Sequence, residues 1–302
     1  MDAPVNQRVE IPGLDSFEVG LYLKRDDLLH PIISGNKFRK LKYNLQRAKK
    51  EKYTKLLTFG GAYSNHILAV ACAGHEHGFE TIGIIRGEEL QNQWKDNPTL
   101  KRAFAYGMQL DFVSREEYRE KNTKRFVEVL QTKYEKPMIL PEGGTNALAV
   151  KGCMEILTEE DASFDHVCCA VGTGGTISGV INASEQHQTV LGFPALKGDF
   201  LKADIATFVK RDNWNLISDY HFGGYGKVDE VLVNFINTFK KETGIPLDPV
   251  YTGKMMFGIV DLIQKGHFPK GSKILAIHTG GLQGITGMNQ RLKQRKMPVL
   301  EI

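Results

Sequence analysis

Cysteine is scarce in this chain of 302 residues, and the four that occur form no Cys-x-x-Cys pair and no metal-ligand spacing. They are Cys72, Cys153, Cys168 and Cys169. We therefore expect neither a disulfide framework nor a metal centre. Long apolar runs are also missing: no stretch approaches the roughly 20 residues that span a bilayer. Because the first residues carry no signal-peptide pattern either, we expect a cytoplasmic protein with no membrane partner.

A strong excess of one charge is absent as well. The chain carries 39 Lys and Arg against 35 Asp and Glu, which leaves a net charge of +4. Its basic residues occur in short runs such as Lys49–Lys52, without interleaved aromatic residues, so the pattern argues against nucleic-acid binding. With 41% hydrophobic residues, the chain is long enough to bury a large core in two lobes.

What the sequence does have is a recurring unit of an apolar strand, a glycine pair and a helix. The unit occurs at Leu56–Gly61, Met138–Gly144, Val167–Gly175 and Ile274–Gly281. Short apolar runs that alternate with helices are typical of parallel strands covered on both faces, so we expect an α/β fold with open, mostly parallel sheets. Ligands bind beyond the carboxyl ends of such strands, where all four glycine pairs lie.

The remaining periodicity predicts further elements and a division into lobes. We expect strands at Val19–Leu23, Thr81–Arg86, Gln109–Val113 and Thr189–Phe193. We expect helices from Phe38 onward and at Asn97–Tyr106, Glu116–Thr132, Asn146–Leu157, Phe200–Lys210, Asp229–Glu242 and Met255–Gln264. The connectivity favours a small inserted α/β lobe at residues 48–145 and a large lobe formed by residues 1–47 and 146–302.

The segment Gly172–Thr176 combines several backbone N–H groups and two hydroxyls with little side-chain bulk, between a strand and a helix. That composition predicts a phosphate-binding loop. The loop lacks the Gly-Lys-Ser/Thr ending of a P-loop, and Ile177 stands where a dinucleotide-binding motif has its third glycine. These departures disfavour triphosphate hydrolysis and leave nicotinamide binding a distant alternative. A tight turn that packs a helix on a sheet would also explain the glycines.

Lys37 lies in the first turn of a predicted helix, four residues before Leu41 and on its apolar side. No carboxylate follows three or four residues later, so burial should lower the pKa of this lysine. A partly neutral lysine is a nucleophile for carbonyl groups. The alternative is a lysine whose ammonium group reaches solvent along its aliphatic stem.

A second candidate anion site, Gly60–His66, places polar side chains on the first turn of another helix. Ser64 either caps that helix or binds a carboxylate, and Asn65 is suited to bond a ring hydroxyl. Two anion sites and a buried lysine together predict a phosphorylated carbonyl cofactor that meets an amino acid. Pyridoxal 5'-phosphate fits that description.

Several motifs in order give the chain a resemblance to a known family. They are Leu21–Leu28, Ser34–Leu41, Gly60–His66, Pro141–Ala147, Gly172–Gly175, Gly224–Gly226, Asp248–Lys254 and His278–Gly281. The chain resembles the 1-aminocyclopropane-1-carboxylate (ACC) deaminase/D-cysteine desulfhydrase family of pyridoxal-phosphate enzymes, which have fold type II, similar to the tryptophan synthase β subunit. The resemblance implies this two-lobe fold and a homodimer.

The resemblance also implies roles for individual residues. Lys37 would bond covalently to the cofactor and move the proton at the substrate's Cα. The cofactor's phosphate would be held by Gly172, Thr173, Gly174, Gly175 and Thr176. Asn65 would bond the cofactor's ring hydroxyl and contact the substrate, while Ser64 and His66 would contact the substrate carboxylate.

On the substrate side, the resemblance places Tyr225 and Tyr251 as walls that either transfer protons or only pack. Ser64 stays open as the second acid–base group beside them. Thr252 or Thr279 would face the cofactor's pyridine nitrogen, and a hydroxyl there makes a weaker electron sink than a carboxylate does. ACC deaminases typically have Glu and Leu at these two positions, whereas desulfhydrase-like members have Thr at both.

These features predict a lyase or deaminase that performs β-elimination on a small amino acid. D-cysteine, converted to pyruvate, sulfide and ammonia, is the preferred substrate. ACC deamination is the closest alternative, and other β-substituted D-amino acids are compatible. A protein that binds the cofactor or an amino acid without catalysis is the alternative from another class.

Overall fold

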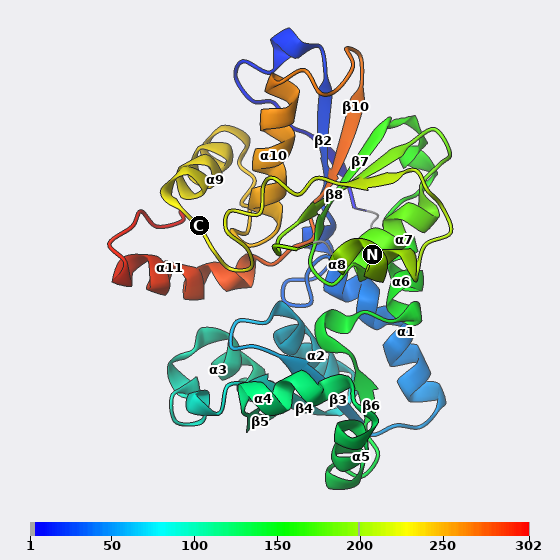
Figure 1. The fold of residues 1–302 in the computed structure, drawn as a ribbon, viewed down its shortest axis with the longest axis vertical. Helices are drawn as coiled ribbons and strands as arrows, with labels where there is room; N and C mark the ends of the chain where they lie inside the picture. Colours follow the sequence, from blue (N-terminus) through cyan, green and yellow to red (C-terminus); the bar gives the residue numbers. More distant parts are fainter. Residues whose placement is uncertain (1–3, 199, 302) are drawn as a thin grey trace.

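Two sheets form the framework of the protein, and each carries its own layer of helices on both faces (Figure 1). The computed structural model describes residues 4–198 and 200–301. The six-stranded sheet has the order β1 (Asn6–Arg8), β2 (Gly20–Lys24), β10 (Lys273–Ile277), β7 (His166–Val171), β8 (Thr189–Pro194) and β9 (Trp214–Leu216). Only β1 and β2 pair antiparallel; the other neighbours in this sheet are parallel.

The second sheet has four parallel strands, in the order β5 (Gln109–Val113), β4 (Glu80–Arg86), β3 (Lys55–Gly60) and β6 (Met138–Leu140). All of its strands come from the chain between residues 55 and 140. The α/β class with mostly parallel sheets is therefore confirmed. We propose residues 48–145 as the small lobe, with the rest of the chain as the large lobe.

Helices cover both faces of both sheets. On the large sheet, α6 (Ala147–Met154), α7 (Gly175–Ala183) and α8 (Phe200–Ala206) share a core cluster with Val167, Cys169 and Val171 of β7. Cys168 and Ala170 face the opposite cluster, with α9 (Glu230–Thr243), α10 (Thr252–Gln264) and α11 (Ile285–Gln294). Alternate residues of one strand thus enter opposite cores, as strand geometry requires.

On the small sheet, α2 (Asn65–His77) and α3 (Pro98–Ala105) cover one face, and α4 (Arg115–Arg119) and α5 (Lys124–Lys133) the other. The helix α1 (Asn36–Lys50) bridges the lobes, because its Leu41 and Leu45 enter the small-lobe core while α1 also contacts α6. Short 3-10 helices occur at Asp15–Phe17, Asp26–Leu29, Glu88–Asn92, Trp94–Asp96, Glu120–Asn122, Glu142–Gly144, Glu159–Ser163 and Leu282–Gly284.

Three element predictions need correction. The single helix expected at Glu116–Thr132 is wrong: α4, a 3-10 turn and α5 replace it, because Thr123 caps a new helix by accepting the N–H of Phe126. The helix expected at Phe200–Lys210 ends at Ala206, and α10 begins at Thr252 rather than at Met255. The strands β1 and β9 were not predicted, since short edge strands carry little periodic signal. The helix α11 follows the glycine pair at Gly280–Gly281, as the recurring unit predicts, although no bounds were expected for it.

Two glycines let α1, α6 and α7 approach one another closely. A Cβ atom at Gly152 of α6 would lie 2.0 Å from the carbonyl oxygen of Arg39 in α1. A Cβ atom at Gly179 of α7 would lie 2.4 Å from the Cβ atom of Cys153 in α6. Helix α6 therefore packs closely against both α1, which carries Lys37, and α7, which follows the predicted phosphate loop.

We expect Gly152→Ala to lower the free energy of unfolding by about 1–3 kcal/mol, because the added methyl group meets backbone that must shift. Helix propensity alone would raise the free energy of unfolding by roughly 1 kcal/mol, because alanine favours a helix more than glycine does. The sign of the measured change therefore shows whether close packing or helix propensity dominates. Urea unfolding followed by circular dichroism measures it. Gly61→Ala is the matched control, since its nearest contact is an Arg86 side-chain nitrogen at an ordinary 3.6 Å. Equal stability of Gly152→Ala and the wild type would contradict the close-packing argument.

Candidate active site

A cavity lies where the carboxyl ends of the strands in both lobes meet. Its lining comprises Ser34, Asn36, Lys37, Lys40, Asn65, Gly143, Ala170, Val171, Gly172, Thr173, Gly174, Thr176, Ile177, Tyr251, Thr279, Gly280, Gly281 and Gln283. Most of these residues belong to the proposed large lobe, while Asn65 and Gly143 follow strands β3 and β6 of the small sheet. The position agrees with the rule that ligands bind beyond the carboxyl ends of parallel strands.

Lys37 lines this cavity from the first turn of α1. Gly35 brings it there: with a φ of 58°, this residue is left-handed, and a Cβ atom on it would lie 2.1 Å from the carbonyl oxygen of Thr279. Burial, followed by the charge of Lys40, lowers the pKa of Lys37 to about 7. The direction is the one that the sequence predicts, and it makes the amine a nucleophile near neutral pH.

Lys40 is a second buried lysine at the cavity, and the sequence did not single it out. Its Nζ atom donates to the carbonyl oxygen of Gly143 at 2.9 Å and to the hydroxyl of Thr145 at 3.1 Å. The hydroxyl of Thr173 lies 3.5 Å away. Burial lowers the pKa of Lys40. Its spacing of three residues from Lys37 places both on one face of α1, which is the only sequence signal that would have found it.

The loop after β7 has the shape of an anion cradle. Gly174 adopts a φ of 80°, and a Cβ atom at Gly175 would lie 2.7 Å from the hydroxyl of Thr145 and 3.2 Å from Nζ of Lys40. Thr176 accepts a hydrogen bond from the amide of Asn36 at 2.8 Å. Four of the five predicted loop residues line the cavity, and Gly175 lies outside the lining. Backbone N–H groups at the start of α7 and the ammonium group of Lys40 therefore converge on one place.

The second predicted anion site is only partly assembled around the cavity. Asn65 lines it, with its amide nitrogen beside Gly281. Ser64 instead caps α2, because its hydroxyl accepts the N–H of Ile67 at 3.3 Å. His66 is 2% exposed and outside the lining, and among residues 4–198 and 200–301 neither ring nitrogen finds a hydrogen-bond partner. Burial and the charges of Lys37 and Lys40 hold its pKa well below the usual range, so this imidazole is neutral.

The two tyrosines lie together, with ring centroids 6.1 Å apart. Tyr251 lines the cavity, whereas Tyr225 lies outside it and is 48% exposed. Lys254 fixes the loop that carries Tyr225, because its buried Nζ donates to the carbonyl oxygens of His221 and Gly224 at 2.8 and 2.9 Å. Burial lowers the pKa of Lys254 to about 8. The tyrosine loop is thus held by a group that reaches neither the cavity nor solvent.

The structure separates the two threonines that the sequence left as alternatives. Thr252 is fully buried outside the cavity lining, and its hydroxyl donates to Oδ2 of Asp248 at 2.6 Å. The same carboxylate oxygen accepts the N–H of Thr252 at 2.8 Å, which closes a tight loop at the start of α10. Thr279 is the threonine that lines the cavity.

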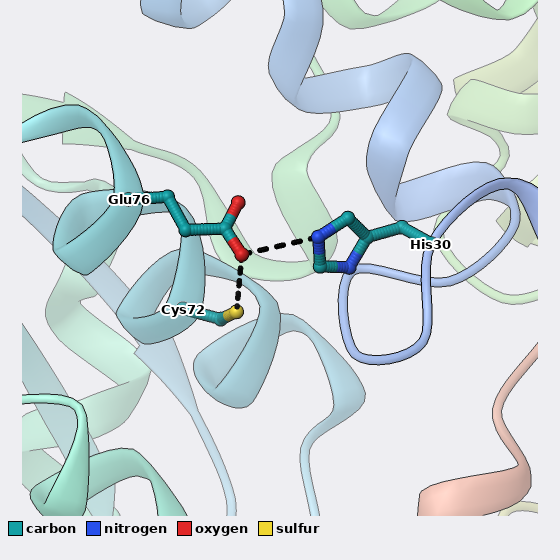
Figure 2. A group of neighbouring side chains, drawn as sticks. All are labelled: His30, Cys72 and Glu76. Atoms are coloured by element: carbon teal, nitrogen blue, oxygen red, sulfur yellow. Dashed lines mark hydrogen bonds and ion pairs between the residues drawn. The ribbon is translucent and has the colours of Figure 1, made fainter. Parts of the chain in front are cut away.

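A group of potential metal ligands occurs elsewhere, at His30, Cys72 and Glu76 (Figure 2). Nδ1 of His30 accepts two backbone N–H groups, from Ile32 at 3.1 Å and Ile33 at 2.9 Å. The proton of the neutral ring therefore lies on Nε2, which donates to Glu76 at 3.1 Å. Since both ring nitrogens are used, this arrangement forms a hydrogen-bonded link between the loop before α1 and helix α2 rather than a metal site.

Lys37, with its lowered pKa, and the glycine-rich loop line one cavity, and this combination suits an enzyme that holds a phosphorylated aldehyde cofactor. Comparisons with known proteins agree. Residues 4–280 match the family described as "Pyridoxal-phosphate dependent enzyme". The chain belongs to this family, and it is a pyridoxal-phosphate enzyme of fold type II.

Three relatives illustrate the similarity. The chain is 32% identical to a Pyrococcus horikoshii protein named "Putative 1-aminocyclopropane-1-carboxylate deaminase", over 89% of this chain and 87% of the relative. It is 31% identical to the bifunctional D-cysteine desulfhydrase/1-aminocyclopropane-1-carboxylate deaminase, mitochondrial, of Arabidopsis thaliana, over 92% and 76%. The crystal structure of an ACC deaminase homologue superimposes with a TM-score of 0.83 at 28% identity, covering 97% of this chain and 94% of that one.

The residues at the cavity fit pyridoxal phosphate. A nucleophilic amine for its aldehyde is present at Lys37, and the cradle at Gly172–Thr176 with Lys40 suits its phosphate. A Cβ atom at Gly172 would lie 3.1 Å from the ring of Tyr251, so the glycine keeps backbone open beside the cavity. We therefore propose that Lys37 binds the aldehyde, that the loop and Lys40 hold the phosphate, and that Asn65 and Thr279 contact the ring.

The pKa of Lys37 predicts how fast the protein binds its cofactor at different pH values. A group with a pKa of about 7 is about one-tenth neutral at pH 6 and about nine-tenths neutral at pH 8. We expect the rate of covalent capture by the cofactor-free protein to rise about tenfold across this interval and then to level off. Stopped-flow absorbance measures the rate, with Nα-acetyl-lysine in solution as the control. A rate that keeps rising through pH 9, as for the free amine, would contradict a lowered pKa.

Proposed function

We propose that this enzyme eliminates the β-substituent of a small amino acid, with D-cysteine as the preferred substrate. The observation that carries the proposal is the absence of any carboxylate from the cavity lining in the described part of the chain, where Thr279 supplies a hydroxyl. A hydroxyl does not hold a proton on the cofactor's ring nitrogen as a carboxylate does. A moderate electron sink suits the loss of a good leaving group such as sulfide.

The overall reaction consumes water and yields pyruvate, ammonia and the released β-substituent. The Cα–H and Cβ–S bonds break, and the electron pair of the Cβ–S bond leaves with sulfur as sulfide. Pyridoxal phosphate, when bound, supplies the electron sink that stabilises charge at Cα. In this proposal Lys37 removes the Cα proton, because its lowered pKa leaves the amine largely neutral above pH 7.

The other residues bind and orient the reactants. In this proposal Asn65 bonds the ring hydroxyl of the cofactor and contacts the substrate, and Tyr251, whose ring lies beside Gly172, forms a wall on the substrate side. Burial, followed by the effect of Tyr225, raises the pKa of Tyr251 well above its usual value, so its hydroxyl remains a proton donor. Ser64 and Tyr225 are the other proposed acid–base candidates, and His66 remains a proposed substrate contact, neutral and without a competing partner.

The direct test is keto-acid release by the cofactor-loaded protein from D-cysteine, L-cysteine and ACC in parallel. We expect pyruvate from D-cysteine and little 2-oxobutyrate from ACC. ACC deamination is the second candidate, favoured by the names of the Pyrococcus relative and of the structural neighbour. Robust formation of 2-oxobutyrate from ACC would contradict our proposal and favour ACC deamination. A change in cofactor absorbance on adding substrate, without formation of any keto acid, would favour a binding protein.

No helix in the described part of the chain is long and apolar enough to cross a membrane. For the environment and assembly of the enzyme we propose the cytoplasm and a homodimer, as the family resemblance implies. Sedimentation of the loaded protein tests the dimer.

A further inference from the structure

A second cavity, of about 280 Å³, lies on the small lobe and is strongly basic. Its lining consists of Arg86, Arg115, Tyr118, Arg119, Lys121 and Glu142. Four cations thus surround a space that contains a single carboxylate. Because like charges gathered around one space repel one another, a ligand that brings negative charge would be favoured there.

The basic cavity lies at the same edge of the small sheet as the active site. Arg86 ends β4, and the register of Gly60 with Ile85 places Arg86 next to Gly61, within 3.6 Å of where a Cβ on that glycine would be. On the other side of β3, Glu142 follows β6, and its neighbour Gly143 lines the main cavity. The two cavities therefore meet at adjacent residues of one sheet edge.

The tyrosines complete this connection. Tyr225 packs against Tyr251, which lines the main cavity. The charges of Arg86 and Glu142 both act on the hydroxyl of Tyr225, and Glu142 also acts on that of Tyr251. The tyrosine pair therefore lies near both the main cavity and the charged groups of the basic cavity.

The four cations of the basic cavity differ in whether an acidic side chain pairs with them. Lys121 pairs with Glu142 at 3.4 Å, and Arg115 pairs with Glu89 at 2.6 Å. Across residues 4–198 and 200–301, neither Arg86 nor Arg119 forms an ion pair.

A buried aromatic ring supports this arrangement from below. The guanidinium of Arg86 lies 5.7 Å and Nζ of Lys121 5.0 Å from the ring centroid of Tyr118. Tyr118 itself is 2% exposed, and its hydroxyl donates to Glu142 at 2.7 Å. The ring therefore gives two cations a fixed platform, which reduces the ordering that a bound anion would have to impose.

We propose that the basic cavity receives a negatively charged β-substituent, so that the substrates include amino acids with a second oxyanion group such as a phosphate or sulfonate. The inference rests on the proposed β-elimination and extends it beyond D-cysteine. Arg86 and Arg119 form charge-assisted hydrogen bonds to the oxyanion. When the Cβ–X bond breaks, the electron pair leaves with X, and the arginines stabilise the charge that X carries away.

Kinetics with two β-substituted alanines that differ in charge test this proposal. The anionic probe is O-phosphoserine and the neutral one β-chloroalanine, each as both enantiomers. We expect Arg86→Gln to lower kcat/KM for O-phosphoserine at least tenfold more than kcat/KM for β-chloroalanine, and Arg119→Gln to act in the same direction. Arg125→Gln, which removes an exposed guanidinium from α5 outside the cavity, is the control.

A binding measurement supplies a second readout. We expect calorimetry of the cofactor-loaded protein to detect inorganic sulfate, and Arg86→Gln to abolish the signal. Turnover of β-chloroalanine but not of O-phosphoserine, or equal losses on both, would overturn the charged subsite and leave β-elimination intact. Turnover of neither of these substrates nor of D-cysteine would overturn the proposed function. Sulfate binding without O-phosphoserine turnover would identify a free-anion site and overturn the substrate assignment.

Discussion

Lys37→Ala should reduce keto-acid formation by about 10³-fold or more, because it removes both the amine that bonds to the cofactor and the proposed base for the Cα proton. After borohydride reduction, mass spectrometry of the wild type should find the cofactor attached to the peptide that contains Lys37. The variant should show no such adduct. Its cofactor-free form should be at least as stable as the wild type, since the mutation removes an amine whose burial lowers its pKa.

Lys49→Ala is the control on the same helix, because Lys49 lies exposed in the last turn of α1. It should leave turnover and the adduct unchanged. Turnover of Lys37→Ala above one-tenth of the wild-type rate, with the adduct found on another lysine, would contradict the assignment and point to Lys40. The two lysines are therefore tested in one experiment.

The sequence predicts two of the segments that line this cavity, for a physical reason. A phosphate loop depends on a local feature, namely glycines that expose backbone N–H groups after a strand, and Gly172–Thr176 has this feature in consecutive residues. Lys37 was found from its place on the apolar side of a helix, with no carboxylate three or four residues later. Lys40 was missed because a lysine on an amphipathic helix usually faces solvent, and only the packing of α1 against α6 and the Gly143 loop buries it.

The other site residues could not be predicted, because their positions depend on contacts between segments that are far apart in the sequence. Nothing local distinguishes Thr252 from Thr279, and only the fold shows that Asp248 engages one hydroxyl while the other lines the cavity. Similarly, Arg86 and Arg119 lie 33 positions apart in sequence and line one cavity, because Arg86 ends β4 and α4 follows the neighbouring strand β5. The low pKa of Lys37 was predictable in direction, since an apolar helix face without a carboxylate implies desolvation.

Lys40→Met should weaken binding of pyridoxal phosphate about 10- to 100-fold, because the buried ammonium group lies beside the phosphate cradle and a charge-assisted hydrogen bond contributes roughly 1.5–3 kcal/mol. Equilibrium titration followed by absorbance measures the affinity. Lys42→Met, which removes a lysine paired with Glu155 at 2.6 Å on the outer side of α1, should bind the cofactor as the wild type does.

Stability distinguishes cofactor binding from a merely structural role of Lys40. Burial lowers the pKa of Lys40, so the folded, cofactor-free protein holds this ammonium group at a cost in free energy, and a methionine of similar length relieves that cost. Gly143 loses one donor in exchange, while Thr145 keeps its hydrogen bond to Thr173 at 2.6 Å. We therefore expect the unfolding free energy of cofactor-free Lys40→Met to stay within about 1 kcal/mol of the wild type or to rise. Weaker cofactor binding with an intact fold assigns Lys40 to the phosphate, whereas a large loss of stability with unchanged affinity would make it a structural lysine.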